Sequence, residues 1–378
     1  MKGQSFMGRM KTVFVSTGSQ ENGTNYRILG LARNALKLGM DAHIVLPGSA
    51  KNHEWFPEGH YDGVPIHFTS GAGAKELKEK YALLCSLRPQ FVHCVAVTIR
   101  CFPACFAYRM LHRCELIIDL DEHMSRIKLY GWWRRTCFLV FEFLAKHCAD
   151  RLIVASRFLE QQFGNRRLRN TLYLPNAVDL ETFEQQRAGW QTLRKTWGEL
   201  KVVTYFGTLS SHYDADMVLK AAERILAVRN DLVFVFVGGG EMLKAFRERT
   251  RENGLEGRIQ FCGFVPDESV PKYLSASDVF VFPIRDNWWN RARCPLKVYS
   301  FVAAMAPIVT NPVGEVHEAL GEKAWYFRDG DINDFITVLE TCLSSGGDDR
   351  RPDPSMAIRH SWLARAEEYV GFLSSRLP

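Results

Sequence analysis

The sequence predicts an α/β protein made of two doubly wound domains. In the first half, short apolar runs alternate with amphipathic stretches, which is the pattern of βαβ units around a parallel sheet. The alternation pauses at residues 174–200 and then starts again. A chain of 378 residues is long enough for two ordinary domains.

The first half is expected to supply five strands, at residues 12–16, 41–46, 91–94, 115–120 and 151–155. Helices are expected between them, at residues 26–38 and 75–87 among others. In the first of these helices, apolar residues from Ile28 to Leu38 recur at helical spacing, and Gly39 follows where helices commonly end.

The second half repeats this arrangement. Strands are expected at residues 202–206, 232–237, 259–262, 279–282 and 307–310. Helices are expected at residues 216–227, 241–252 and 270–276. Residues 344–354 contain Gly and Pro pairs that predict a loop, and a final amphipathic helix is expected at residues 356–377.

Composition and charge limit the classes of function. The net charge of +6 is a mild bias that suits anionic ligands or a membrane surface, but there is no dense Lys/Arg tract of the nucleic-acid-binding kind. The ten cysteines lack the paired CxxC spacing of metal sites, so we expect free thiols in a reducing, cytoplasmic compartment. The first residues carry no secretory signal, and no window reaches the roughly 20 apolar residues that span a bilayer, which predicts a soluble or peripheral protein.

Residues 294–320 form the most informative segment. Pro295 suits the first turn of a helix because the N–H that it lacks would have no partner there. Lys297 falls in the same turn, beside the positive end of the helix dipole, where a phosphate would be attracted. Gly314 and Glu315 open a second helix after the next strand. Two such helix starts suit a diphosphate, whereas the simpler alternative for Lys297 is a solvated side chain.

Three loops rich in small residues follow predicted strands, where open α/β sheets bind ligands. Residues 16–27 contain Gly23, residues 205–216 contain Gly207, and residues 237–241 contain three consecutive glycines. None of these loops matches GxGxxG or a P-loop, so a dinucleotide cofactor is not expected. Anion binding and ordinary turn chemistry are both open for them.

A cluster of titratable residues lies at the carboxyl ends of two strands in the first half. His93 ends one strand, and Asp119, Asp121, Glu122 and His123 end the next. Such a group could transfer protons, act as a nucleophile or bind sugar hydroxyls. We predict catalytic roles for His93, Asp121 and Glu122, and the alternative is a set of solvated loop acids that cap the following helix.

Residues 126–147 begin with aromatic and basic side chains and continue as a predicted apolar helix. It carries Lys128, Trp132, Trp133, Arg134 and Arg135 ahead of the apolar run. Trp and Arg together suit a membrane interface with anionic headgroups. A core helix with a basic edge would explain most of the same pattern.

Several motifs, taken in order, resemble those of the retaining glycosyltransferases with the GT-B fold, family 4 in particular. They are ENGTNYRILGLARNALKLGMDAHIVLP near the beginning, LPNAVD at residues 174–179, FGTLS at residues 206–210, FVFVGGGE, IQFCGFVP, LSASDVFVFP and PLKVYSFVAAMAPIV. Each motif is weak alone, but the ordered set covers nearly the whole chain.

The resemblance implies two Rossmann-like domains that face a central cleft. Residues 10–178 would bind the acceptor, residues 200–350 would bind a nucleotide-sugar donor, and residues 355–378 would form a helix that returns to the first domain. Such enzymes are generally metal-independent, because helix dipoles and basic side chains neutralise the leaving diphosphate. The resemblance therefore implies no metal and no cofactor other than the nucleotide-sugar co-substrate.

The resemblance also implies roles for donor-binding residues. Gly207 and Thr208 would line the diphosphate, and Lys297 would lie near the phosphates. The base would lie between Phe264 and Val265. The helix that starts at residues 314–315 would face the diphosphate or the transferred sugar.

Some positions depart from the family pattern. Ser300 stands where a Glu usually contacts the donor ribose, and Ala292 stands where a companion carboxylate is expected eight residues earlier. The Arg/Lys pair that usually follows the first glycine of the second domain is replaced by Thr208 and, approximately, Tyr213. Val95 replaces a second His of the first domain. A Ser can still hydrogen-bond a hydroxyl, but less strongly than a carboxylate does.

The sequence therefore predicts a hexosyltransferase-type enzyme of polysaccharide biosynthesis. It would move a sugar, with retention, from a nucleotide donor to a glycan or lipid-linked acceptor, in the cytoplasm and peripherally on the inner face of the cell membrane. An anionic membrane surface is an expected partner, and nucleic acid is not. Arg285, Glu315 or Glu318 would compensate for the missing carboxylates. The alternative is a non-catalytic homologue that acts as a binding or partner subunit.

Overall fold

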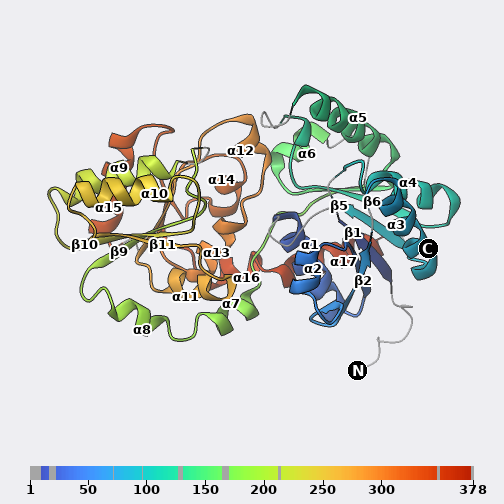
Figure 1. Cartoon of the computed structure of the whole chain (residues 1–378), viewed down its shortest axis with the longest axis horizontal. Coiled ribbons are helices and arrows are strands. Elements are labelled where there is room, and N and C mark those ends of the chain that lie inside the picture. The colour runs from blue at the N-terminus through green and yellow to red at the C-terminus, as the bar shows by residue number, and fades with distance from the viewer. Residues whose placement is uncertain are drawn as a thin grey trace. The chain divides into compact units, whose positions relative to one another are not determined.

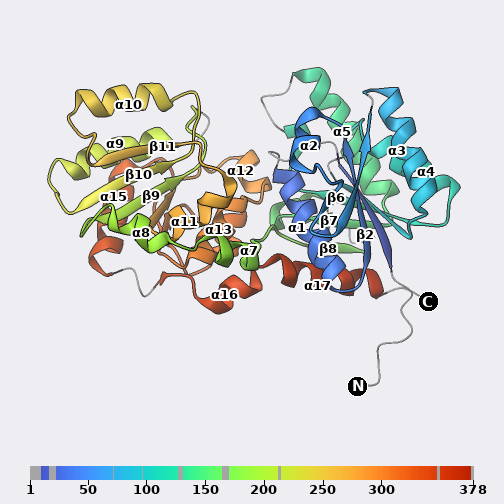
Figure 2. The same cartoon turned by 60° about the horizontal axis from the view of Figure 1, so that its bottom comes forward.

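The computed structural model describes residues 10–16, 23–70, 72–95, 97–126, 131–163, 170–211, 214–346 and 350–375. The chain forms two compact units (Figures 1 and 2). The first unit extends to Ala177 and also includes the segment Arg291–Cys294 and the last helix from Trp362. The second unit comprises Val178–Asn290 and Pro295–Ser361.

The first unit contains an eight-stranded sheet with the order β3-β4-β2-β1-β5-β6-β7-β8. All neighbouring strands are parallel except β3 and β4. The strand order reverses between β1 and β5, which is the pattern of a doubly wound sheet. The strands are β1 (Lys11–Val15), β2 (Asp41–Pro47), β3 (His60–Tyr61), β4 (Val64–Thr69), β5 (Phe91–Val95), β6 (Glu115–Leu120), β7 (Arg151–Val154) and β8 (Thr171–Tyr173).

Helices cover this sheet, and alternate strand residues pack beneath them. Val13, Val92 and Ile118 belong to one apolar cluster with side chains from α3, α4, α5 and α6. The helices of the unit are α1 (Gly23–Lys37), α2 (Ala50–Trp55), α3 (Ala74–Leu87), α4 (Phe102–Leu111), α5 (Trp132–Cys148), α6 (Arg157–Phe163) and α17 (Trp362–Ser374), with a 3-10 turn at Met124–Arg126.

The second unit contains a six-stranded parallel sheet with the order β11-β10-β9-β12-β13-β14. Its strands are β9 (Lys201–Phe206), β10 (Leu232–Val237), β11 (Ile259–Gly263), β12 (Val279–Phe282), β13 (Ile308–Thr310) and β14 (Trp325–Tyr326). Its helices are α7 (Leu180–Gln186), α8 (Trp190–Lys195), α9 (Ala215–Leu226), α10 (Leu243–Glu252), α11 (Val270–Ser275), α12 (Trp288–Ala292), α13 (Leu296–Ala304), α14 (Glu315–Leu320), α15 (Ile332–Ser344) and α16 (Pro354–Arg359), with a 3-10 turn at Asp267–Ser269.

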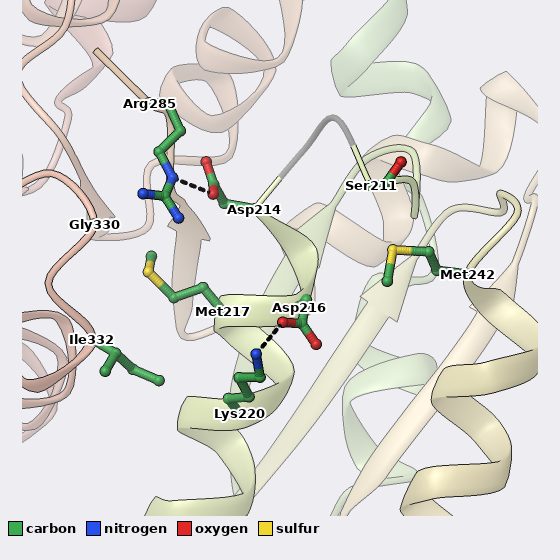
Figure 3. A pocket seen from close by; sticks show the side chains of 9 residues that line it. All are labelled: Ser211, Asp214, Asp216, Met217, Lys220, Met242, Arg285, Gly330 and Ile332. Carbon is green, nitrogen blue, oxygen red and sulfur yellow. Dashed lines mark hydrogen bonds and ion pairs between the residues drawn. The ribbon is translucent and has the colours of Figure 1, made fainter.

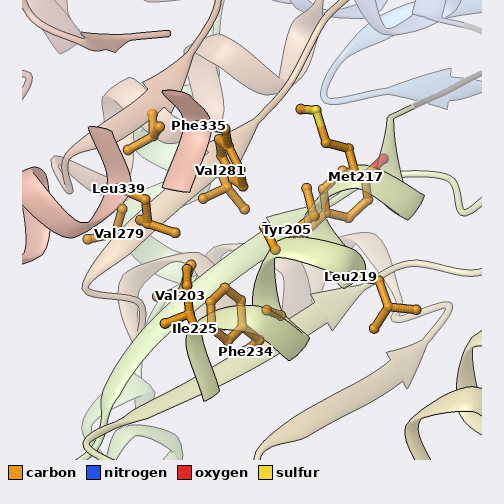
Figure 4. Close-up of a cluster of buried hydrophobic side chains, with 14 of the residues drawn as sticks. Val203, Tyr205, Met217, Leu219, Ile225, Phe234, Val279, Val281, Phe335 and Leu339 are labelled. Atoms are coloured by element: carbon orange, nitrogen blue, oxygen red, sulfur yellow. The ribbon is translucent and has the colours of Figure 1, made fainter. Parts of the chain in front are cut away.

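The two faces of this second sheet are covered by different helices. Phe234 and Phe236 of β10 pack with α9, α10 and α15, and Figure 4 shows part of this cluster. The alternate residues Val233 and Val235 pack in a second cluster on the opposite face, with Trp197. β10 is therefore apolar on both faces, as expected for a central strand of a parallel sheet.

The structure confirms the predicted fold class of two doubly wound α/β sheets, but several elements differ from the predictions. The strands β3, β4 and β14 were not predicted, because β3 and β14 have only two residues each and Pro65 lies within β4. The final helix is also not continuous. It is divided into α16 and α17 at His360 and Ser361, where the backbone N–H of Val178 donates to the carbonyl of His360 and Ser361 forms an isolated parallel bridge with Val178.

The last helix, α17, packs against α1 within the first unit. A Cβ atom at Gly30 of α1 would lie 2.5 Å from the indole ring of Trp362, which is only 4% exposed. Gly30 therefore permits the close approach of the two helices, and any side chain there would displace the indole.

We expect Gly30→Val to destabilise the first unit by about 1–3 kcal/mol, because overpacking at a buried contact forces side chains or backbone to shift. Chemical denaturation followed by circular dichroism would measure the loss. Gly371→Ala on the exposed side of α17 is the control, since nothing lies within 4 Å of its new methyl group. The control should be neutral or slightly stabilising, and equal stability of the two variants would contradict the packing account.

Candidate functional site

The carboxyl ends of the parallel strands in the second unit carry the predicted donor-binding loops. The loop after β9 lies against the loop after β10, with the N–H of Gly207 donating to Val237 and the N–H of Leu209 donating to Gly239. A Cβ atom at Gly238 would lie 2.0 Å from the carbonyl oxygen of Gly207. A Cβ atom at Gly240 would likewise lie 2.2 Å from the carbonyl oxygen of Leu209. Gly238 and Gly240 thus allow two backbone loops to approach each other, so the turn geometry explains these two glycines without a ligand.

Lys297 lies in the first turn of α13, directly over Gly207. The Lys297 Nζ atom is 5.7 Å from the centroid of the Phe206 ring, and a Cβ atom at Gly207 would lie 2.5 Å from that Nζ atom. Pro295 is the N-cap residue, one position before the first turn in which it was predicted, and Lys297 lies in the first turn as predicted, so its ammonium group lies near the positive end of the helix dipole. The ammonium, the helix start and the Gly207 backbone together form a place where an anion would be stabilised.

Other predicted donor-binding residues surround these loops. Thr208 is exposed next to Gly207, and Ser300 lies one turn after Lys297 and is half-buried. Phe264 follows β11 with 78% of its surface exposed, whereas Val265 packs against the apolar cluster beneath it. An exposed phenyl ring at the carboxyl end of a strand is available for stacking on a planar ligand.

Gly314 precedes α14 with a φ of +50°, and Glu315 begins that helix. Glu315 is 2% exposed, so its carboxylate is enclosed within the unit. Glu318, one turn further, is exposed. Of the two acids predicted to compensate for Ser300, only Glu318 therefore lies on the surface.

Arg285 occupies a separate cavity of about 460 Å³ that lies beside α9 and α15 (Figure 3). Its Nε atom donates to the Oδ1 of Asp214 at 2.6 Å, and its guanidinium lies against Gly330. Asp216 and Lys220 form a second ion pair, at 2.6 Å, in the same cavity. Both cations are thus paired with carboxylates there, which leaves little net charge to attract a phosphate.

In the first unit, the predicted cluster forms a buried polar network. Both side chains of the Arg27–Asp119 ion pair are 1% exposed, and two guanidinium nitrogens donate to the carboxylate at 2.7 and 3.0 Å. His93 is fully buried, with its Nε2 atom 3.2 Å from Asp119 and its Nδ1 atom 3.0 Å from the hydroxyl of Tyr369. His93 is therefore placed as a buried partner of Asp119 and not as a group open to a substrate.

The pKa shifts in this network follow from burial and from the ion pair. Burial alone would raise the pKa of Asp119, but Arg27 and His93 outweigh it, so that the pKa is lowered. Burial also lowers the pKa of His93, although Asp119 opposes this effect. Asp119 is thus held as a carboxylate, and its charge is compensated by Arg27.

Asp121 and Glu122 lie just beyond β6 and are both partly exposed. Asp121 accepts a hydrogen bond of 2.5 Å from the hydroxyl of Thr24, and burial raises its pKa. Burial and the neighbouring Asp121 raise the pKa of Glu122 to about 7, although Arg293 opposes the shift. Glu122 can therefore gain or lose a proton near neutral pH, as a general acid or base must.

His123, the last member of the predicted cluster, points elsewhere. Its Nε2 atom lies 3.5 Å from Glu142 of α5, and burial lowers its pKa to about 4. The histidine is thus neutral at physiological pH and belongs to the packing of α5.

The segment Arg291–Cys294 explains one departure from the family pattern. Ala292 is 1% exposed within the apolar cluster of the first unit, and its carbonyl accepts a hydrogen bond of 2.7 Å from the hydroxyl of Ser156. The carbonyl of Cys294 likewise accepts a bond of 2.6 Å from the amide of Asn176. A carboxylate at position 292 would be buried among apolar side chains at a high desolvation cost.

The remaining predictions concern α5 and the loop before α1. Trp132, Trp133 and Arg134 are exposed at the start of α5, while Arg135 is half-buried and donates to the carbonyl of Ser125. Lys128 and residues 17–22 of the loop at residues 16–27 lie outside the described residues. Gly23 is described and is the first residue of α1.

All ten cysteines are free thiols. Within the described ranges, no group of three or more His, Cys, Asp or Glu side chains is arranged to hold a metal ion. The same part of the chain has no helix long and apolar enough to cross a membrane.

Comparisons with known proteins define the class of the fold. Residues 200–345 match the family described as glycosyl transferases group 1. The crystal structure of HepE from Anabaena in complex with UDP-glucose aligns with 97% of this chain and 100% of its own, with a TM-score of 0.75 and 16% sequence identity. The predicted resemblance to the GT-B glycosyltransferases is thereby confirmed.

Curated relatives match parts of the chain. The phosphatidylinositol N-acetylglucosaminyltransferase GPI3 subunit of Saccharomyces cerevisiae is 23% identical over 202 residues, covering 52% of this chain and 44% of that protein. A putative teichuronic acid biosynthesis glycosyltransferase, TuaH of Bacillus subtilis, is 23% identical over 233 residues, covering 60% and 56%. This chain thus spans about half the length of these relatives.

Sequence reasoning missed four residues around this cluster: Arg27, Asn176, Arg293 and Tyr369. They lie far along the chain from Asp119, and no motif links them to it. Arg27 and Asn176 belong to the motifs ENGTNYR and LPNAVD, so those motifs were the available signals.

We expect Glu122→Gln to make the first unit more stable relative to wild type at pH 8 than at pH 5. The unfolded chain releases this proton near pH 4.5, while the native state holds it to about pH 7. The contribution of Glu122 to stability therefore falls as the pH rises from about 4.5 to about 7. Thermal melts at both pH values measure the difference, with the exposed Glu367→Gln as control. A difference that is the same at both pH values would contradict the raised pKa.

Proposed function

We propose that the chain is a hexosyltransferase that moves a sugar from a nucleotide-sugar donor to a glycan or lipid-linked acceptor, with retention. The main support for the proposal is that Lys297, at the start of α13, lies over Gly207. Both residues belong to the part of the chain that matches the glycosyl transferases group 1 family. The solved structure of HepE with UDP-glucose, which has the same fold, supports this class of donor.

In this reaction, the bond between the anomeric carbon of the sugar and the oxygen of the leaving diphosphate breaks. A bond forms between that carbon and an acceptor hydroxyl oxygen, and the hydroxyl proton passes to the leaving phosphate. The ammonium of Lys297 and the dipole of α13 would stabilise the negative charge that develops on the diphosphate. These groups are the reason we expect no metal to be needed.

The acceptor would bind at the carboxyl edge of the first sheet, near Asp121 and Glu122. A carboxyl group that is partly protonated near neutral pH, as Glu122 is, can donate hydrogen bonds to hydroxyl groups and accept hydrogen bonds from them. The relatives support a lipid-linked or glycan acceptor, since one is named as a phosphatidylinositol N-acetylglucosaminyltransferase subunit and the other as a putative teichuronic acid biosynthesis glycosyltransferase. A protein that glycosylates such acceptors would lie in the cytoplasm, at the inner face of the membrane.

A non-catalytic role is the second candidate. Ser300 and Ala292 replace the carboxylates expected near the donor, and one relative is described as a subunit of a transferase. Incubation with a panel of UDP-, GDP- and ADP-sugars, with and without lipid extracts as acceptor, distinguishes the two candidates. The enzyme releases nucleoside diphosphate with at least one donor, whereas the non-catalytic protein binds a donor but releases none.

Lys297→Ala should weaken nucleoside diphosphate binding about tenfold or more, because a hydrogen bond to a charged group contributes about 1.5–3 kcal/mol. Isothermal titration calorimetry with UDP, GDP and ADP measures the affinity. Lys195→Ala is the matched control, because that exposed side chain ends α8, ahead of the amino end of β9 in the same unit. Unchanged affinity in Lys297→Ala would rule out its phosphate role.

Phe264→Ala should weaken nucleotide binding, because stacking of a base on an aromatic ring contributes about 1–3 kcal/mol. Binding of inorganic pyrophosphate, which has no base, should be unaffected. Phe264→Tyr preserves the ring and should retain the affinity for the nucleotide. An equal loss for the nucleotide and for pyrophosphate would show that the ring does not contact the base.

A further inference from the structure

Helix α5 carries a row of large apolar side chains that are exposed. Their exposed fractions are 76% for Trp132, 65% for Trp133, 51% for Leu139, 52% for Val140 and 61% for Phe143. The spacings of three, four and seven residues place them along one side of the helix. We refer to these five residues as the α5 stripe. Contiguous exposed apolar surface of this kind marks an interaction site in soluble proteins.

The opposite side of α5 holds the helix to its unit. Phe141 and Leu144 pack against the apolar cluster of the first sheet. Glu142 is 5% exposed and accepts hydrogen bonds of 3.0 and 2.5 Å from the backbone N–H and the hydroxyl of Ser125. The helix is thus anchored without the α5 stripe, so the outward apolar side chains are not explained by the packing of the unit.

The charges on α5 are almost all positive. Its one acidic residue is the buried Glu142. Arg134 is exposed, and Arg135 and Lys146 are half-buried. The apolar stripe is therefore flanked by cations without an exposed carboxylate on the same helix, which suits an apolar surface bordered by negative charge.

We propose that the α5 stripe docks onto a lipid bilayer with anionic headgroups, with the axis of α5 parallel to the bilayer plane. Trp132 and Trp133 would lie at the level of the headgroups, where Trp is enriched. Leu139, Val140 and Phe143 would enter the boundary with the acyl chains, as the apolar side of an interfacial helix does. The sequence predicted only the aromatic and basic beginning of this surface, and the structure extends it to Phe143, over about two further turns of helix.

A second copy of the chain fits the same surface less well. Pairing two α5 helices would bring Arg134, Arg135 and Lys146 of both copies together with no exposed acid on the helix to compensate them. Like charges at an interface oppose association, whereas anionic headgroups attract such residues. The charge distribution therefore favours a lipid surface.

Co-sedimentation of the full chain with vesicles tests the proposal. Wild type should bind vesicles of mixed phosphatidylglycerol and phosphatidylcholine, and less so at high salt. The variants Trp132→Ala/Trp133→Ala and Leu139→Ala/Val140→Ala/Phe143→Ala should each lower the bound fraction by roughly tenfold or more. The control is Val228→Ala/Ile358→Ala, which removes exposed apolar side chains of the second unit (80% and 62% exposed) and should bind as wild type does.

Circular dichroism melts of every variant separate loss of docking from loss of folding. The proposal is overturned if folded stripe variants bind as wild type does, if wild type does not bind, or if it binds neutral phosphatidylcholine vesicles equally well. It is also overturned if wild type forms a dimer without lipid and the stripe variants are monomeric, because a second copy would then be the occupant. Nucleotide affinity is measured separately, so failure of docking leaves the proposed sugar transfer standing.

Discussion

The buried ion pair between Arg27 and Asp119 is the interaction on which the arrangement of the first unit's candidate site depends. It joins α1 to the carboxyl end of β6, and the same carboxylate holds His93 of β5, which in turn contacts Tyr369 of α17. Another guanidinium nitrogen of Arg27 donates to Asn176 at 3.1 Å. Four elements therefore meet around a single compensated charge. Removing either partner would leave the other charge buried and unpaired, which typically costs about 3–5 kcal/mol.

The same network also places Arg293 near the catalytic candidate Glu122. Asn176 holds the backbone of Cys294, so that the segment Arg291–Cys294 becomes part of the first unit. Arg293 then lies close enough to oppose the raised pKa of Glu122. The same placement buries Ala292, which gives a physical reason for the lost carboxylate at that position. The departure from the family pattern is thus consistent with the packing around it and does not by itself imply lost activity.

Much of the fold could be predicted because long, strongly apolar segments such as β10 and regular helices such as α9 have clear periodicity. The start of α13 was also predictable, since Pro295 and Lys297 act locally. His93 shows the limit of sequence reasoning. Its predicted position at the end of a strand suggested a catalytic group, but it is buried within β5 and contacts Tyr369, which is 276 residues away. The division between α16 and α17 likewise depends on a distant backbone partner, Val178, which no local pattern reveals.

The central claim is that the carboxyl edge of the second sheet holds the diphosphate of a nucleotide-sugar. A crystal structure of the chain with a bound nucleoside diphosphate tests it most directly. The account predicts phosphate oxygens within hydrogen-bond distance of the Lys297 ammonium, beside the Gly207 backbone, with the base on Phe264. Phosphates bound instead in the cavity of Arg285 and Asp214, with Lys297 untouched, would contradict it.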